Sequence, residues 1–177
     1  SLVKYAYTPL ASNILMSDAK GDRQKVAQAI SELVSQSRLN TKHVAVGLPS
    51  RNVFSTVVDF DRLSPQETAK AIKYQAESLI PTPLDSSKLD WAVIGDSPTD
   101  QTKVEVLLNS VDNSFIEERL DLLEGIGLNV IAFEPNSLAL ARALVPHDSI
   151  LPQLVLDIGE KSTDLVVVAG GAPRLVR

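Results

Sequence analysis

The sequence predicts an α/β fold, and three observations lead to this prediction. Segments with the helical spacing of apolar residues alternate along the chain with short apolar or alternating segments typical of strands. The 177 residues are 44% hydrophobic and 22% charged, which is the composition of a globular protein. Two stretches, at Ser64 and at Ser114, have the sequence of a helix start with a capping box. The length is enough for one ordinary domain or two small ones.

Strands are expected where apolar residues alternate with polar ones or run together between turn residues. The predicted strands are residues 2–8, 43–48, 53–60, 89–95, 103–110 and 128–133, an apolar strand from Leu154 into Asp157-Ile158-Gly159, a second that ends at Gly170-Gly171, and a third that starts at Leu175. A polar turn separates 89–95 from 103–110, so these two strands are expected to form a hairpin.

Helices are expected where apolar residues recur on one face behind a capping residue. The predicted helices are 23–37 capped by Asp22, 65–80 capped by Ser64 with Glu67 at its third position, 115–125 capped by Ser114, and one from Pro135 or Asn136 to Leu144. The order is therefore β-α-β, β-α-β-β-α, β-α and β-β-β. The last 24 residues are expected to form strands without a covering helix, so we expect the chain to be a fragment.

Composition excludes several classes of function. The net charge is −5 and no cluster of Lys and Arg occurs, so a nucleic-acid surface is not expected. The chain has no cysteine, which excludes thiolate metal sites and disulfides, and its histidines, His43 and His147, lie far apart in the sequence. No apolar run approaches the roughly 20 residues that span a bilayer, and no signal peptide opens the sequence. The cytosol is the expected compartment.

A candidate phosphate site lies in the stretch LVLDIGEKSTDLVVVAGG, residues 154–171. An acidic residue at a strand end, before a glycine turn, can place a carboxylate near a metal-bound phosphate, while turn N–H groups and hydroxyls donate to phosphate oxygens. The suitable residues are Asp157, Gly159, Ser162, Thr163 and Asp164. A plain hairpin with a polar turn explains the same residues equally well. A P-loop is excluded, because Glu160 separates Gly159 from Lys161 and a strand follows.

Glu134 is the second candidate, since it ends a predicted strand immediately before a helix. One interpretation is a carboxylate that stabilises the helix start through the macrodipole. The other pairs it with Asp157, the strand-end acid 23 residues later.

These motifs resemble those of a known superfamily. Asp157-Ile158-Gly159 with Ser162-Thr163-Asp164 resembles the second phosphate motif of the actin, sugar-kinase and heat-shock-chaperone ATPases, and Glu134-Pro135 resembles their connecting segment. Within that superfamily the chain is most similar to the PilM-like proteins of type IV pilus assembly. The segment AIKYQAESLIPTP, residues 71–83, resembles a helix of that family that ends in a Pro-x-Pro step. The resemblance extends to residues 5–10, 44–49 and 136–144 and to Trp91.

The resemblance implies a partial actin-like (ribonuclease H-like) core subdomain with an inserted β-α-β-β-α subdomain, as in the cell-division protein FtsA. Residues 1–50 and 128–148 would form an incomplete first-lobe core, 51–127 the inserted subdomain, and 149–177 the truncated start of the second lobe.

The resemblance also implies that the full-length protein binds ATP with Mg²⁺. The hairpin residues would hold phosphate, Asp157 would hold Mg²⁺ through water, and Glu134 would be the catalytic candidate. The first Asp-Ile-Gly motif and the adenosine-binding part lie outside this sequence, and Glu160-Lys161 stands where many relatives have glycines. We therefore expect weak or no nucleotide binding by the fragment, and at most a weak ATPase in the full-length form.

The function implied is that of a cytoplasmic adaptor, bound to the inner membrane only through its partners. Its groove, between core and inserted subdomains, would take the N-terminal cytoplasmic segment of a PilN-like inner-membrane protein, and other pilus assembly proteins would also bind. Strand 54–60 and the hairpin of the inserted subdomain are candidates for that groove, although each residue could equally serve the core. The alternatives are an ATPase or small-molecule kinase of the superfamily, an FtsA-like filament protein at the membrane, and the type II secretion counterpart.

Overall fold

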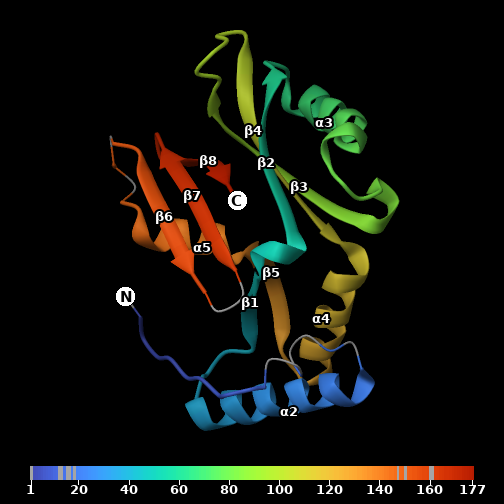
Figure 1. The fold of residues 1–177 in the computed structure, drawn as a ribbon. Helices are drawn as coiled ribbons and strands as arrows, with labels where there is room; N and C mark the ends of the chain where they lie inside the picture. Colours follow the sequence, from blue (N-terminus) through green and yellow to red (C-terminus); the bar gives the residue numbers. More distant parts are fainter. Residues whose placement is uncertain are drawn as a thin grey trace. The chain divides into compact units, whose positions relative to one another are not determined.

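The computed structural model describes residues 2–11, 14, 17, 19–146, 148–149, 151–159 and 162–177 (Figure 1). The chain divides into two compact units, residues 1–46 with 117–132 and residues 47–116 with 133–177. His147, Glu160 and Lys161 lie outside the described residues. The subdomain boundaries inferred from the family resemblance remain a prediction.

The first unit contains helix α2, most of α4, and the first parts of the paired strands β1 and β5. The bounds are α2 Lys20–Ser37, β1 His43–Leu48, α4 Asn113–Gly125 and β5 Asn129–Pro135. The prediction that Asp22 caps α2 is wrong, because the helix starts earlier and its N-cap is Ala19, which makes no side-chain cap bond. Asp22 instead lies in the first turn and accepts a hydrogen bond from Lys25 at 2.9 Å. An ion pair of 2.7 Å between Arg23 and Glu118 links α2 to α4.

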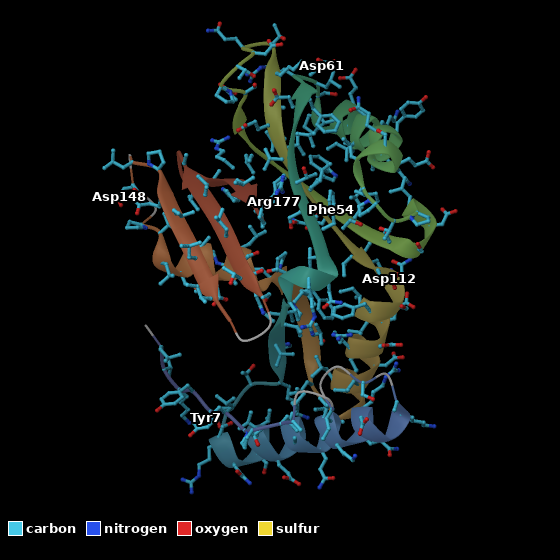
Figure 2. The ribbon with its side chains drawn as sticks, viewed as in Figure 1. Tyr7, Phe54, Asp61, Asp112, Asp148 and Arg177 are labelled. Carbon is cyan, nitrogen blue, oxygen red and sulfur yellow. The ribbon has the colours of Figure 1, made fainter. Side chains whose placement is uncertain are left out.

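The predicted N-terminal strand at residues 2–8 does not form. Residues 2–11 have neither helix nor strand, and the side chains of Leu2, Val3, Tyr5 and Tyr7 are at least 80% exposed (Figure 2 labels Tyr7). The alternating pattern alone could not decide this, because a strand also needs a neighbouring backbone with which to exchange hydrogen bonds.

The start of α4 also differs from the prediction. A carboxylate oxygen of Asp112 accepts hydrogen bonds from the backbone N–H groups of Ser114 and Phe115, at 2.8 and 3.3 Å, and from the Ser114 hydroxyl. Asp112 is therefore the N-cap and Ser114 lies inside the helix, so the predicted capping box at Ser114 is wrong. The predicted end at Gly125 is confirmed.

The second unit begins with an antiparallel sheet in the order β2-β4-β3, with helix α3 against one face (Figure 1). Its elements are η1 Ser50–Asn52, β2 Val53–Asp61, α3 Pro65–Leu79, η2 Leu84–Ser86, β3 Ser87–Asp96 and β4 Lys103–Asp112. The predicted hairpin of β3 and β4 is confirmed. So is the capping box, since the Ser64 side chain accepts from the backbone N–H of Glu67 and the Glu67 side chain from that of Ser64.

The core between α3 and this sheet consists of alternate strand residues and one helix stripe. Its buried members are Phe60, Ile72, Val104, Val106 and Leu108. Ile72 of α3 is 1% exposed, while Val106 and Leu108 of the central strand are fully buried. Burial of this apolar area is the main stabilising contribution to this part of the unit.

The second unit ends with helix α5 (Asn136–Leu144) and the antiparallel sheet β6-β7-β8 (Gln153–Ile158, Thr163–Ala169 and Ala172–Val176). The prediction that no helix covers these strands is wrong, because Ala141 of α5 packs against four valines of the sheet. These are Val155, Val166, Val168 and Val176. Gly170 and Gly171 form the turn between β7 and β8 with φ of 59° and 75°, values that glycine adopts without strain.

An ion pair joins the two sheets of the second unit. Arg174 of β8 pairs with Glu105 of β4, and its Nε also donates to the Ala169 carbonyl at 3.0 Å. Glu105 alternates with Val104 and Val106, so it lies on the sheet face opposite α3. The side chain of Glu105 is 13% exposed and that of Arg174 is 26% exposed, so the ion pair is partly buried.

Candidate functional site

The candidate phosphate hairpin forms as the sequence predicts. Strands β6 and β7 pair with Asp157 opposite Asp164 and Ile158 opposite Thr163. The backbone N–H of Gly159 donates to the carbonyl of Ser162 at 2.9 Å, which closes the turn. A Cβ on Gly159 would lie 3.2 Å from that same carbonyl oxygen, so the glycine permits a close approach of the two backbones.

The structure therefore brings together the five predicted hairpin residues. Asp157, Gly159, Ser162 and Thr163 are exposed and Asp164 is half-buried, so their polar groups are accessible to a ligand. Asp157 and Asp164 share a sheet face, and two like charges directly opposite each other are unfavourable unless a cation or donor lies between them. Among the described residues no group of three or more His, Cys, Asp or Glu side chains could hold a metal ion. The roles of these residues toward phosphate or Mg²⁺ remain a prediction.

Glu134 lies at the end of β5 and is engaged by helix α5. Its carboxylate forms a two-pronged ion pair with the Arg142 guanidinium, in which Nη2 lies 2.6 Å from Oε2. These hydrogen bonds and the charge of Glu134 raise the pKa of Arg142 above its ordinary value. Within the described part of the chain, no hydrogen bond connects Glu134 to the hairpin. A catalytic role would require the carboxylate to exchange Arg142 for a substrate or a water molecule.

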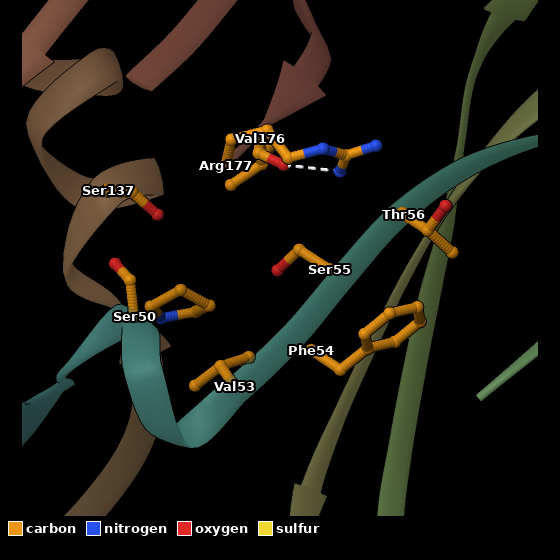
Figure 3. Close-up of a pocket in the computed structure, with 9 residues that line it drawn as sticks. Ser50, Val53, Phe54, Ser55, Thr56, Ser137, Val176 and Arg177 are labelled. Carbon is orange, nitrogen blue, oxygen red and sulfur yellow. Dashed lines mark hydrogen bonds between the residues drawn. The ribbon is translucent and has the colours of Figure 1, made fainter. Parts of the chain in front are cut away.

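A pocket that sequence analysis did not predict lies beside the start of α5, with a volume of about 330 Å³ (Figure 3). Its lining comes from the start of β2, the start of α5 and the end of the chain. The lining residues are Ser50, Val53, Phe54, Ser55, Thr56, Pro135, Ser137, Val176 and Arg177. Their separation in sequence explains why no motif indicated the pocket. The only local signal was a proline followed two residues later by a serine, at a helix start.

The side chain of Asn136, the first residue of α5, lies close to the backbone at the end of β1. A Cβ built on Gly47 would lie 2.1 Å from Oδ1 of Asn136, so a larger residue at position 47 would displace this exposed side chain.

The fold and the hairpin define the class of protein. The β6–β7 hairpin has an Asp-Ile-Gly strand end and is covered by helix α5, and the elements β2-α3-β3-β4-α4 lie between β1 and β5 in the sequence. This is a partial actin-like α/β fold with an inserted β-α-β-β-α subdomain. The chain belongs to the family of the type IV pilus assembly protein PilM, whose family model matches residues 1–173.

Two solved structures support the assignment. The chain is similar to a protein in the structure of the PilM–PilN type IV pilus biogenesis complex, with 26% identity and a TM-score of 0.81, and the match covers 96% of this chain and 52% of that one. It also resembles the cytoplasmic domain of EpsL, an inner-membrane component of the type II secretion system of Vibrio cholerae. That match has 18% identity and a TM-score of 0.56, covers 85% of this chain and 56% of that one, and supports the fold alone. The chain therefore spans about half the length of these relatives. None of the helices in its described residues is long and apolar enough to cross a membrane.

Proposed function

We propose that this chain is part of a cytoplasmic adaptor of type IV pilus assembly, which holds the N-terminal cytoplasmic segment of a PilN-like inner-membrane protein. The observation that carries the proposal is the similarity over 96% of the chain, at a TM-score of 0.81, to a protein whose structure is described as a PilM–PilN complex. In this proposal the adaptor reaches the inner membrane, and other pilus proteins, through its partners.

Strand β2 is the place where we propose that an extended segment docks. It lies at one edge of the β2-β4-β3 sheet and pairs with β4 on one side. The other side can offer backbone N–H and C=O groups to an added strand, which is a common mode of peptide recognition. Val57 is half-buried, on the face opposite the α3 core, and Asp59 and Asp61 are exposed, so the edge has both apolar and polar side chains for specificity.

Nucleotide binding is the second part of the proposal and concerns the longer protein. The exposed Ser162 and Thr163 hydroxyls can donate to phosphate oxygens, while Asp157 can hold Mg²⁺ through water. This chain supplies one side of such a site, so its own affinity for ATP is low. Hydrolysis, if any, would be slow and would belong to the longer protein.

Two experiments test these parts separately. For docking, a photo-crosslinking amino acid replaces Asp61 at the end of β2 or, as the matched control, Tyr74, which is 87% exposed on α3. The PilN-like segment should crosslink from position 61 and not from position 74. Crosslinking from neither position, together with no binding in calorimetry, contradicts the docking proposal.

For nucleotide, Mg-ATP binding is measured by calorimetry on this chain and on a chain extended at both ends. The extended chain should bind, this chain should bind weakly or not at all, and Thr163→Ala should weaken binding by the extended chain. If the extended chain does not bind, the hairpin is structural and the peptide-binding role stands without it.

A further inference from the structure

We propose that the pocket at the start of α5 binds a small oxyanion, namely a phosphate or a carboxylate group. The site is separate from the hairpin considered above, because neither Asp157, Gly159 nor the Ser162–Asp164 segment lines it. The proposal goes beyond the peptide docking and nucleotide binding proposed above and does not depend on either.

The first observation is a pair of buried hydroxyls without partners. Ser137 is 2% exposed, and its Oγ has no hydrogen-bond partner among the described residues. The Oγ of Ser50 is likewise buried and unpaired within that part of the chain. Figure 3 shows the hydroxyls of Ser50 and Ser137 directed into the same space. Buried hydroxyls in native proteins nearly always have partners, so two unpaired ones around one cavity indicate a missing acceptor.

The second observation is the helix start itself. Helix α5 has nine residues, and Pro135 at its N-cap makes no side-chain cap bond. The N–H groups of its first turn lack intrahelical acceptors, and together they carry the partial positive charge of the macrodipole. A helix start with free N–H groups and a serine hydroxyl in its first turn favours a bound anion.

The charges around the pocket agree with an anion. Arg177 is the charged residue of the lining, and no Asp or Glu occurs among the described residues that line the pocket. The nearest acidic residue in sequence, Glu134, is already paired with Arg142. Although the whole chain has a net charge of −5, the charged side chain in the lining of this pocket is a cation.

Size and hydrogen-bonding capacity narrow the ligand class. A volume of about 330 Å³ is at the lower end of small-molecule sites, and it accommodates one phosphate or carboxylate with its nearest atoms. The hydroxyl of Ser55 already donates to Asn109 at 2.7 Å, so it does not add a donor. Nη1 of Arg177 already donates to the carbonyl of Val176 at 2.7 Å (Figure 3). The donors for an anion are therefore the hydroxyls of Ser50 and Ser137, the first-turn N–H groups of α5 and the remaining N–H groups of the Arg177 guanidinium. Val53 and Val176 add apolar side chains to the lining.

The test is an NMR titration of the ¹⁵N-labelled chain with sodium phosphate, at an ionic strength held constant with sodium chloride. Residues added after Arg177 keep a terminal carboxylate away from the pocket. The amides of Ser137 and Leu138 should shift in a saturable way with phosphate and not with chloride. Ser137→Ala and Arg177→Gln should each weaken binding about tenfold, the loss expected for one charge-assisted hydrogen bond.

Ser110→Ala is the matched control, because Ser110 is also 2% exposed and unpaired among the described residues but does not line the pocket. It should leave the affinity unchanged. Parallel titrations are made with acetate, ATP and an acidic peptide. The probe that binds most tightly shows which kind of molecule supplies the anion. No saturable shift at α5 with any of these probes, or equal affinities for Ser137→Ala, Arg177→Gln and Ser110→Ala, overturns the proposal.

Discussion

Replacing Gly47 by alanine tests how the end of β1 is packed against the start of α5. The new Cβ would lie 2.1 Å from Oδ1, 3.3 Å from Cγ and 3.9 Å from Nδ2 of Asn136, and these are its three nearest atoms outside the adjoining residues of the chain. Since non-bonded atoms do not approach to 2.1 Å, the Asn136 side chain or the backbone must move. Asn136 is exposed and its Oδ1 is the far end of the side chain, so the clash can be relieved by a change of rotamer. A strained rotamer of this kind costs about 0.5–1.5 kcal/mol.

A second effect has the opposite sign. Gly47 has no positive φ, so alanine fits its backbone conformation and stabilises the fold by about 0.4–1 kcal/mol through the unfolded state. The net result for Gly47→Ala is a loss of at most about 1 kcal/mol, or a fall in Tm of no more than roughly 4 °C for a chain of this size.

The Asn136→Ala background reverses the expected sign. Without Oδ1, Cγ and Nδ2, no atom lies within 3.9 Å of the new Cβ, so Gly47→Ala should then stabilise by about 0.5 kcal/mol. The assay is urea unfolding of the wild type, both single variants and the double variant, from which the coupling between the two positions follows. Equal destabilisation by Gly47→Ala in both backgrounds would show that Asn136 is not the obstacle, and would refute this explanation.

The remaining predictions concern the inserted sheet and the helix caps. Ile72→Ala should cost about 2–5 kcal/mol, because it opens a cavity between α3 and its sheet, whereas an effect below 1 kcal/mol in urea unfolding would mean that the site collapses without loss. Ser64→Ala removes the acceptor for the Glu67 N–H and should cost about 1 kcal/mol, while Ser64→Asp, which keeps an acceptor, should be close to neutral. Acid should weaken both helix starts. Hydrogen bonds from the side chain and then the backbone of Ser64 lower the pKa of Glu67, and those from Ser114 and Phe115 lower the pKa of Asp112. The stabilisation is therefore complete above the unfolded values, 4.5 and 3.8, and is lost as pH falls through the lower folded values. Thermal melts from neutral to acid pH check this loss, and Asp112→Asn, which still caps but does not titrate, should have a flatter acid dependence than the wild type.

Local chemistry explains which parts of the fold were predictable from sequence. Ser64-Pro65-Gln66-Glu67 places a cap, a proline and a reciprocal acceptor within four residues, and it folds as predicted because all its hydrogen bonds are local. The β6–β7 hairpin was predictable for the same reason, since a glycine turn joins two apolar strands.

Competing local signals and distant partners explain the errors. Asp112 and Ser114 are both good caps two residues apart, and the spacing to Glu117 favoured Ser114, whereas β4 continues to Asp112 and places its carboxylate at the helix start. The segment at 2–8 has strand-like alternation, but burial and pairing with other segments decide whether a strand forms.

The candidate site divides in the same way. Its hairpin residues were identifiable because they adjoin in sequence, while the pocket combines segments around Ser50, Ser137 and Arg177 that only the tertiary fold brings together. Glu134 pairs with Arg142, which lies eight residues later in the sequence, near the end of α5. No sequence pattern predicts an ion pair at this spacing.

Binding of a PilN-like partner is the central claim, and calorimetry with the N-terminal cytoplasmic segment of that protein from the same organism tests it most directly. A peptide of the same composition in scrambled order is the control. Saturable one-to-one binding of the native segment, and none of the scrambled peptide, is the predicted result. Failure of the native segment to bind both this chain and a chain extended at both ends would contradict the proposed adaptor function.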